Sequence, residues 1–172
     1  FNMRFLILFI FLITNVFAND LPEIKNIVIH KDPKTYNNVI FLDKKDQKIN
    51  IKDFNENLII LNFWATWCAP CRREIPLLNN TQKEYQDMSV QIIGIAVDVL
   101  DDVIAYSEET PFEYPVLVGE EEAIAIAENA NIEFIGLPFT MLVDDQNEII
   151  KTHLGEIKEH HIVMLTEVIR GM

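Results

Sequence analysis

Apolar and polar residues follow one another along the chain in a pattern that predicts alternating strands and helices. Two continuous apolar runs, residues 58–63 and 90–97, have the length of strands that are covered on both faces of a sheet. Shorter apolar segments predict further strands at residues 115–118, 140–143 and 148–152. The spacing of apolar residues and the position of acidic residues predict helices at about residues 71–87, 101–109, 119–129 and 158–170. This alternation is typical of an α/β fold with a mixed sheet flanked by helices.

The N-terminal part of the chain carries weaker signals. Residues 19–38 are mixed and polar around one apolar patch at residues 27–29, which indicates a lead-in segment with one edge strand. Residues 39–42 and 48–51 flank a short charged stretch, and this pattern is typical of a β-hairpin. No internal repeat, low-complexity tract or linker divides residues 39–172. We therefore expect these residues to form one domain.

The first residues have the features of an export signal. Arg4 is followed by an apolar run over residues 5–13, and the segment ends on the small residue Ala18. This pattern predicts a signal peptide over residues 1–18 with cleavage after Ala18. The alternative is an uncleaved membrane anchor, although the apolar run is shorter than the ~20 residues that span a bilayer. No cysteine lies near the cleavage site, which excludes a lipid-modified cysteine. The pattern favours an exported protein of the periplasm.

Composition narrows the class of protein. Hydrophobic residues make up 49% of the 172 residues and charged residues 24%, which suits one globular domain with a full core. The formal net charge of −13 repels phosphate backbones and therefore argues against binding of nucleic acid. The two cysteines are too few for a framework of several disulfides or for a zinc site of four cysteines. In an exported chain, however, two cysteines are in a compartment where a disulfide can form.

The two cysteines are separated by two residues and lie where a buried strand is followed by a helix. Cys68 is expected at the helix N-terminus, where free amides and the helix dipole stabilise a thiolate. Cys71 follows one turn later on the inward side, within bonding reach of Cys68. This arrangement predicts an exposed, nucleophilic Cys68 and a shielded, resolving Cys71.

Two other interpretations of the cysteine pair have weaker support. A purely structural disulfide between Cys68 and Cys71 would close a very small loop and would contribute little through chain entropy. Half of a zinc site would need two more ligands, and the histidines do not have a recognisable metal-binding spacing. The candidate histidines are His30, His153, His160 and His161. We expect His160 and His161 to form an exposed pair on the last helix.

The segment Phe63-Trp-Ala-Thr-Trp-Cys-Ala-Pro-Cys71 resembles the active-site motif of the thioredoxin superfamily. Residues 72–76 (Arg-Arg-Glu-Ile-Pro) and 136–140 (Gly-Leu-Pro-Phe-Thr) bring the resemblance closer to the exported TlpA/ResA-like branch. That branch includes thiol–disulfide oxidoreductases of cytochrome c maturation. The resemblance covers residues 39–170 and implies a sheet of four or five strands flanked by helices. It also implies an added N-terminal hairpin, which residues 39–51 match.

The resemblance also implies roles for individual residues. Cys68 matches the attacking cysteine of the family, and Cys71 matches the resolving cysteine. Pro138 matches the cis-proline that faces the disulfide, and the backbone of Leu137 would pair with a bound substrate strand. A cis bond before proline costs little energy, so this assignment is physically reasonable. Trp67 matches the tryptophan that packs beside the attacking cysteine.

Two positions depart from ordinary thioredoxin. Asn62 stands where thioredoxin has a buried aspartate, and an amide cannot take up a proton. Glu74, three residues after Cys71 on the inward side, is the expected replacement, because burial would raise the pKa of its carboxyl and let it relay protons to the thiols. The alternative is a solvent-facing Glu74 in the first turn of the helix. The spacer Ala69-Pro70 lacks the histidine of strongly oxidising relatives, which disfavours an enzyme that introduces disulfides.

The sequence therefore predicts an exported thiol–disulfide oxidoreductase that uses a dithiol and needs neither a cofactor nor a metal. The resemblance implies that it reduces disulfides of protein substrates such as apocytochrome c, and that a membrane thiol protein donates the electrons. The alternatives are a disulfide oxidase or isomerase and a metal-delivery or assembly chaperone that binds through its thiols. A thiol peroxidase is disfavoured, because its nucleophile needs a threonine three residues earlier and this chain has Ala65 there. The other tryptophan of the motif, Trp64, is assigned to the core.

Overall fold

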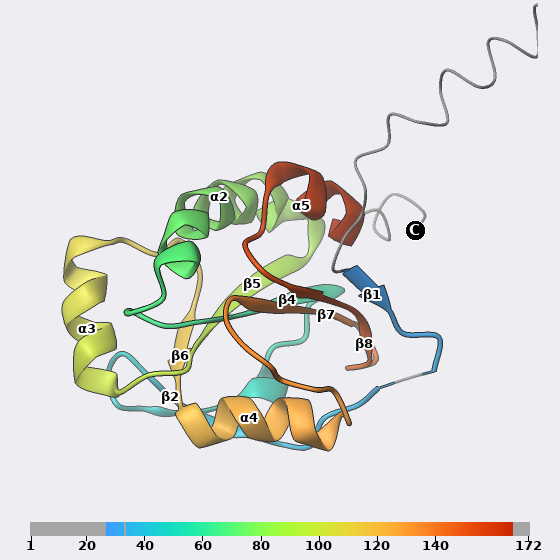
Figure 1. Cartoon of the computed structure of the whole chain (residues 1–172), viewed down its shortest axis with the longest axis horizontal. Helices are drawn as coiled ribbons and strands as arrows, with labels where there is room; N and C mark the ends of the chain where they lie inside the picture. The colour runs from blue at the N-terminus through green and yellow to red at the C-terminus, as the bar shows by residue number, and fades with distance from the viewer. Residues whose placement is uncertain (1–26, 33, 167–172) are drawn as a thin grey trace, which may run out of the picture.

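The central strand, β4 (Leu58–Trp64), is buried along its whole length. In the computed structural model, which describes residues 27–32 and 34–166, β4 pairs in parallel with β5 (Val90–Ala96) and antiparallel with β7 (Phe139–Asp144). The other strands are β1 (Ile27–Ile29), β2 (Ile40–Asp43), β3 (Lys48–Asn50), β6 (Val116–Val118) and β8 (Ile149–Leu154). Together these strands form one sheet of eight strands in the order β1-β8-β7-β4-β5-β6-β2-β3 (Figure 1).

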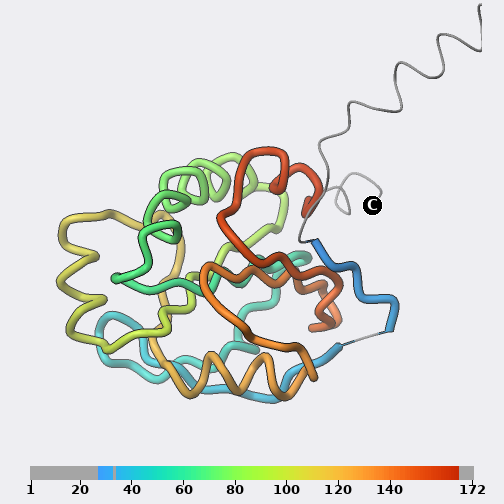
Figure 2. Tube along the Cα trace, viewed as in Figure 1, coloured from blue at the N-terminus to red at the C-terminus, as the bar shows by residue number. Residues whose placement is uncertain are grey.

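Helices cover both faces of this sheet. They are α2 (Ala69–Tyr85), α3 (Leu100–Glu109), α4 (Glu120–Asn129) and α5 (Glu159–Thr166), with short 3₁₀ helices η1 (Ile51–Asp53) and η2 (Gln86–Met88). The helices α2 and α5 lie on one face, and α4 covers the opposite face (Figures 1 and 2). The buried side chain of α3, Val103, belongs to the same hydrophobic cluster as buried side chains of α2 and α5. The two cysteines lie in the layer between the sheet and α2.

Alternation of side chains along β4 explains both the continuous apolar run and the position of Asn62. Ile60 packs in the cluster under α2, whereas Ile59 and Leu61 pack in the cluster under α4. Because successive side chains of a strand point to opposite faces, Asn62 points to the α2 face together with Ile60. A polar side chain is therefore placed inside the layer that contains the cysteines.

The expected fold class is confirmed, together with the N-terminal hairpin that the resemblance implied. The predicted hairpin is present as β2 and β3, and it extends the sheet by pairing β2 with β6. At the opposite edge, β1 pairs antiparallel with β8, as expected for an edge strand in the lead-in segment. The expected hairpin and the expected edge strand therefore extend the sheet at its two edges, and the sheet has eight strands in all.

The helix that carries the cysteines begins earlier than expected. It begins at Ala69 rather than at residue 71, because Cys68 acts as its N-cap and Pro70 lies in its first turn. Proline is favoured at this position because its fixed φ suits a helix and the amide it lacks would be unpaired anyway. Both cysteines therefore belong to the start of α2.

Some expectations fall on residues outside the described part of the chain. The predicted signal peptide, residues 1–18, lies there, as do residues 167–170 of the last expected helix. Among residues 27–32 and 34–166, no helix combines the length and the apolar character that a membrane span requires.

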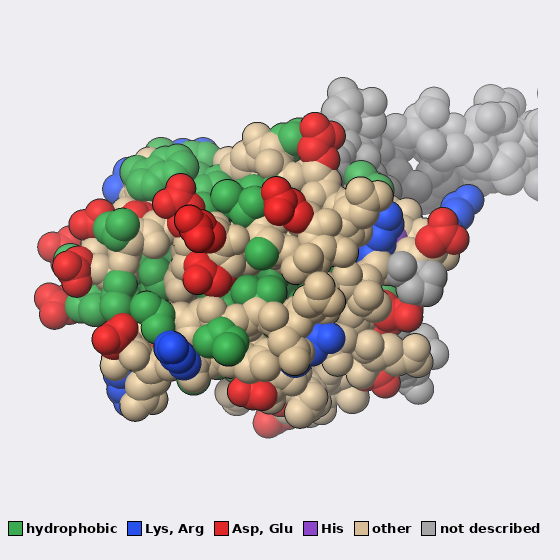
Figure 3. Space-filling model, turned by 90° about the horizontal axis from the view of Figure 1, so that it is seen from below, with side chains coloured by type: hydrophobic (Ala, Val, Ile, Leu, Met, Phe, Trp, Pro, Cys, Tyr) green, Lys and Arg blue, Asp and Glu red, His purple; other side chains and the backbone are tan. Residues whose placement is uncertain are grey.

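Acidic side chains dominate the charged surface. On the face seen from below, Asp and Glu side chains are scattered among apolar and neutral groups, and Lys and Arg side chains are fewer (Figure 3). This distribution agrees with 27 acidic against 14 basic residues in the chain. Part of the acidic excess lies in the first turn of α4, at Glu120, Glu121 and Glu122, where negative charge is favourable toward the helix dipole.

Candidate active site

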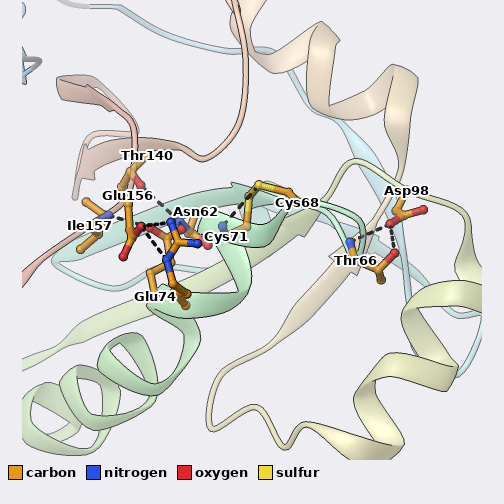
Figure 4. Close-up of a disulfide and its surroundings, with 10 residues drawn as sticks. Asn62, Thr66, Cys68, Cys71, Glu74, Asp98, Thr140, Glu156 and Ile157 are labelled. Atoms are coloured by element: carbon orange, nitrogen blue, oxygen red, sulfur yellow. Dashed lines mark hydrogen bonds and ion pairs between the residues drawn. A yellow bond between two sulfur atoms is a disulfide. The ribbon is translucent and has the colours of Figure 1, made fainter.

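Cys68 and Cys71 form a disulfide at the junction of β4 and α2 (Figure 4). Cys68 has the extended backbone of an N-cap residue (φ −86°, ψ 101°), and Cys71 lies in the first turn of the helix with its Cα 5.3 Å away. The backbone N–H of Cys71 donates a hydrogen bond to the Sγ atom of Cys68, with an N···S distance of 3.3 Å. The sulfur of Cys68 is thus held at the positive end of the helix dipole.

The two cysteines are less different in exposure than the sequence suggested. Cys71 is fully buried, as expected, but Cys68 is also only 6% exposed. The expectation of an exposed Cys68 is wrong in this disulfide-bonded state, because its Sγ bends back over the first turn of α2 toward Cys71. The large side chain of the motif that is exposed is the neighbouring Trp67, at 68%, whereas Trp64 is fully buried and belongs to the core as predicted.

Glu74 lies inside the molecule, one turn after Cys71 on α2, and is 1% exposed. Its Oε1 atom accepts a hydrogen bond from Nδ2 of Asn62 at 2.7 Å, and its Oε2 atom accepts one from the backbone N–H of Ile157 at 2.7 Å (Figure 4). Burial raises the pKa of this carboxyl to about 7, although the two hydrogen bonds favour the charged form and oppose the shift. The negative charge of Glu156 raises the pKa further. The inward position that the sequence predicts for Glu74 is therefore observed.

Asn62 connects Glu74 to the rest of the sheet. Its Nδ2 atom also lies 3.3 Å from Oγ1 of Thr140, the residue that pairs with Asn62 across β4 and β7. Tyr114 is buried in the same region. Burial is the main cause that raises the pKa of its phenol, and the charge of Glu74 raises it further. The carboxyl is thus bound by one side-chain amide and one backbone amide, and the side-chain amide is linked in turn to the hydroxyl of Thr140.

The peptide bond between Leu137 and Pro138 is cis, which the sequence predicted by resemblance. It lies directly before β7, whose first residue, Phe139, pairs with Phe63 of β4. Leu137 packs against the hydrophobic cluster that contains both cysteines. The carbonyl of Pro138 accepts a hydrogen bond from the backbone N–H of Gly155 at 2.9 Å. The cis-proline loop therefore lies next to the end of β4, the strand that leads into the cysteine motif, and is joined to the end of β8.

Sequence reasoning did not find the residue that fixes the turn before Cys68. The Oδ2 atom of Asp98 accepts hydrogen bonds from the backbone N–H of Thr66 at 2.8 Å and from its Oγ1–H at 2.7 Å (Figure 4). Asp98 follows β5, and the parallel strands β4 and β5 end at the same edge of the sheet. An acidic residue just after the strand next to the motif was the signal that could have identified it.

A second overlooked contact lies on the outer side of Glu74. Arg73 donates from Nε and Nη2 to Oε2 of Glu156, at 3.0 and 2.6 Å. The hydrogen bond with Arg73 is the main reason that the pKa of Glu156 lies below its usual range. Sequence alone could not pair these residues, because they lie far apart in the chain and both belong to charged surface positions.

The histidines do not lie as the sequence suggested. His160 is exposed, but His161 is only 8% exposed, and its ring centroid lies 4.2 Å from that of His153 and 4.0 Å from that of His160. The expectation of an exposed pair is wrong for His161, because α5 turns this side chain toward β8. Burial is the main cause that lowers the pKa of His161 to about 4. Within the described residues, no three His, Cys, Asp or Glu side chains are grouped as a metal site requires.

A disulfide between cysteines separated by two residues, at the start of the helix that follows a central strand, together with a cis-proline before the neighbouring strand, defines a thioredoxin-like thiol–disulfide oxidoreductase. Residues 33–153 match the AhpC/TSA family, and the chain belongs to that family. Over 120 residues, or 69% of this chain and 67% of the other, it is 30% identical to the thiol–disulfide oxidoreductase ResA of Bacillus thuringiensis subsp. konkukian. It is also 30% identical over 115 residues to the thioredoxin-like protein YneN of Bacillus subtilis, covering 63% of each chain.

Solved structures show the same fold. The secreted thiol–disulfide isomerase from Corynebacterium glutamicum superposes with a TM-score of 0.71 at 20% identity, over 88% of this chain and 96% of the other. The putative thiol:disulfide interchange protein DsbE from Chlorobium tepidum superposes with a TM-score of 0.68 at 21% identity, over 81% and 96%. At this level of identity, these two similarities show the fold alone.

Proposed function

We propose that this thiol–disulfide oxidoreductase is an exported reductase of protein disulfides. In the proposal Cys68 attacks the substrate, Cys71 resolves the mixed disulfide, and Glu74 accepts the proton that Cys71 releases. The observation that carries the proposal is the buried carboxyl of Glu74, one helical turn from Cys71, with its pKa raised to about 7. A base with such a pKa is well matched to proton transfer near neutral pH.

The first step uses the position of Cys68 as the N-cap of α2. In the reduced protein, the N–H of Cys71 and the helix dipole stabilise the thiolate of Cys68. This thiolate attacks one sulfur of a substrate disulfide, and the substrate S–S bond breaks as the Cys68–substrate bond forms. The other substrate sulfur leaves as a thiolate and takes a proton from water.

The second step returns the protein to the state seen in the structure. The thiol of Cys71 gives its proton to the carboxylate of Glu74, and the resulting thiolate attacks Sγ of Cys68. The Cys68–substrate bond breaks, the Cys68–Cys71 disulfide forms, and the second substrate sulfur leaves as a thiolate. Two electrons have then passed from the protein to the substrate, and a thiol donor must reduce the disulfide before the next cycle.

Substrate contact is proposed for Trp67, Leu137 and Pro138. Trp67 offers a large exposed aromatic surface directly before Cys68. The cis-proline loop packs against the cluster that contains the cysteines, and we propose that an extended substrate segment pairs with the backbone of Leu137 and faces Pro138. Backbone pairing of this kind accepts many sequences, which suits a reductase of different protein substrates.

The finer assignments rest on resemblance and on the sequence. We propose apocytochrome c or a related assembly protein as the substrate, a membrane thiol protein as the electron donor, and the periplasm as the location. The predicted signal peptide and the resemblance to the TlpA/ResA-like branch support them. The spacer Ala69-Pro70, which lacks histidine, supports the reducing direction, and Ala65 disfavours a thiol peroxidase.

The order of attack can be tested by trapping. Cys71→Ser removes the resolving thiol, so Cys68 is expected to stay bound to the substrate in a mixed disulfide that non-reducing electrophoresis and mass spectrometry detect. The matched control is Cys68→Ser, which keeps one cysteine but lacks the attacking one. Adducts of Cys68→Ser in place of Cys71→Ser would reverse the two roles. Absence of adducts from both variants, with a model disulfide peptide supplied, would contradict the proposed exchange.

A further inference from the structure

The segment between β8 and α5 crosses α2 beside Glu74 and is held there by two adjacent pairs of residues. Glu156 is bound by Arg73 through two nitrogen atoms, and the next residue, Ile157, donates its backbone N–H to Glu74. Arg73 and Glu74 are likewise adjacent on α2. The ion pair on the surface and the hydrogen bond in the interior therefore lie side by side, and Figure 4 shows Glu156, Ile157 and Glu74 together.

We propose that Arg73 and Glu156 are positioning residues that hold the backbone N–H of Ile157 on Glu74 and thereby set how readily this carboxylate takes the proton of Cys71. The proposal rests on the proposed function of Glu74 as proton acceptor. It assigns a role to two residues that touch neither the disulfide nor a substrate.

The segment begins at a glycine, and contacts farther along fix its position against α2. Gly155 has φ 109°, a conformation that glycine adopts without strain, and it directly precedes Glu156. The side chain of Ile157 is buried in the hydrophobic cluster under α2, which fixes how deep the segment lies. The contact with Arg73 fixes the segment along the helix, so the N–H of Ile157 stays aligned with Oε2 of Glu74.

The same segment also reaches the cis-proline loop. The N–H of Gly155 donates to the carbonyl of Pro138, and two residues later the N–H of Ile157 donates to Glu74. Residues 155–157 therefore connect the proposed substrate-binding loop with the proposed proton acceptor. A change at Arg73 is transmitted to Glu74 through this short connection.

The charges around Glu74 determine the direction of the effect. Its carboxyl accepts hydrogen bonds from Asn62 of β4 and from the N–H of Ile157, and it interacts with the charges of Glu156 and of Tyr114 before β6. Arg73 is bound to Glu156, and Thr140 of β7 is linked to the carboxyl only through Asn62. The N–H of Ile157 lowers the pKa of Glu74, and the negative charge of Glu156 raises it. Loss of Arg73 loosens the hydrogen bond from Ile157 and leaves the negative charge of Glu156 without its ion pair. Both changes raise the pKa of Glu74.

Carboxyl titration of Glu74 by NMR in the oxidised protein tests the proposal without reference to catalysis. Arg73→Met is expected to raise the titration midpoint of Glu74 by about half a unit to one unit, which is roughly a threefold to tenfold change in the acid dissociation constant. Arg73→Lys keeps the positive charge, so its titration midpoint for Glu74 is expected to lie close to that of the unaltered protein. The matched control is Arg72→Met, which removes an equal charge from the adjacent, exposed position. An unchanged midpoint in Arg73→Met, or an equal shift in Arg72→Met, would overturn the proposal.

Hydrogen exchange measures the positioning directly. In Arg73→Met and in Glu156→Gln, the amide of Ile157 is expected to exchange roughly ten times faster than in the unaltered protein, because its hydrogen bond opens more often. The amide of Ile162, which donates to the carbonyl of Lys158, serves as the internal reference. Unchanged exchange at Ile157 in both variants would contradict the positioning role. Should Glu74→Gln leave the reaction rate unchanged, the proton role of Glu74 would fail, while these two measurements would still decide whether the ion pair positions the amide.

Discussion

Glu74 is the residue on which the proposed chemistry depends most. It is buried between α2 and the sheet, and both of its oxygen atoms accept hydrogen bonds, from Asn62 and from the N–H of Ile157. Burial alone would hold the carboxyl neutral, and hydrogen bonds alone would hold it charged. The two effects together leave its pKa at about 7, where the carboxyl can both take up and release a proton.

The pH dependence of exchange is expected to report this pKa. With Glu74 present, the rate of the resolving step should rise as the pH passes through about 7, because the carboxylate form accepts the proton of Cys71. Glu74→Gln should remove this rise and slow the step at pH 7 on the order of 10²-fold, the lower end of general-base contributions. Single-turnover kinetics across the pH range would measure both effects. A variant that keeps the rise near pH 7 would show that another group is the proton acceptor.

The same pKa affects stability. The carboxyl of Glu74 has a folded-state pKa of about 7 and an unfolded value near 4.5, so the folded state binds the proton more tightly between these pH values. The contribution of this residue to stability is therefore fully present below pH 4.5 and is lost as the pH rises to about 7, by about 3 kcal/mol in total. Denaturant unfolding gives the free energy of unfolding of the oxidised protein and of Glu74→Gln. As the pH rises over this range, this free energy should fall in the unaltered protein relative to the variant. A difference in free energy of unfolding that stays constant with pH would contradict the raised pKa.

For single residues, the sequence predicted positions better than partners. The inward position of Glu74 followed from its spacing after Cys71, and the core position of Trp64 followed from the apolar strand. The contacts of Glu74 with Ile157 and of Arg73 with Glu156 join segments that lie far apart in the chain, so no local pattern indicates them. Burial of His161 was missed because packing of α5 against β8, and not the sequence of the helix, decides which side chain points inward.

Among the elements, the junction of β4 and α2 positions Cys68, the cysteine proposed to attack the substrate. The central strand ends at Trp64, a short turn follows, and the helix begins with Cys68 as its N-cap. The turn itself is fixed from the neighbouring strand, since Asp98 after β5 accepts two hydrogen bonds from Thr66. Two parallel strands that end at the same edge therefore place and hold the active-site turn.

Removal of Asp98 should loosen this turn. Asp98→Ala is expected to destabilise the protein by about 1–2 kcal/mol through the two lost hydrogen bonds and to slow the attack by Cys68 several-fold. Chemical denaturation and the rate of thiol alkylation at Cys68 would measure the two effects. The control is Asp101→Ala, which removes the same charge from an exposed position on the first turn of α3. It should change the stability and the alkylation rate by much less. Equal effects of the two variants would mean that charge, and not the contact with Thr66, is responsible.

The elements were predictable where their signals were continuous. The strands β4 and β5 and the helices after them agree with the sequence pattern within a few residues, because a buried parallel strand shows an unbroken apolar run. The short edge elements were also expected, as an edge strand at residues 27–29 and a hairpin over residues 39–51. The strands to which they pair, β8 and β6, could not be predicted, because these pairings join segments that lie far apart in the chain. The position of Cys68 at the N-terminus of α2 was expected from the sequence, although the spacing of apolar residues placed the start of the helix two residues late.

The whole molecule places a dithiol at the edge of a well-packed α/β domain with a strongly acidic composition. The two sides of the redox couple are stabilised by different features. The helix dipole and the N–H of Cys71 favour the thiolate of Cys68, and therefore the reduced form. Burial of Cys71 and of Glu74 disfavours additional charge beside the pair. The balance between these effects decides whether the protein donates or accepts electrons, and about 30 mV corresponds to about 1.4 kcal/mol for this couple.

The reduction potential of the Cys68–Cys71 disulfide decides whether the protein is a reductase. Equilibration of the protein against defined thiol buffers, followed by quantification of the free thiols, gives this value. A reductase supplied with electrons by a membrane thiol protein is expected to have a potential near or below about −230 mV. A potential between about −120 and −180 mV, the range of strong oxidants and isomerases, would contradict the proposed direction and would identify the protein as a disulfide oxidase or isomerase.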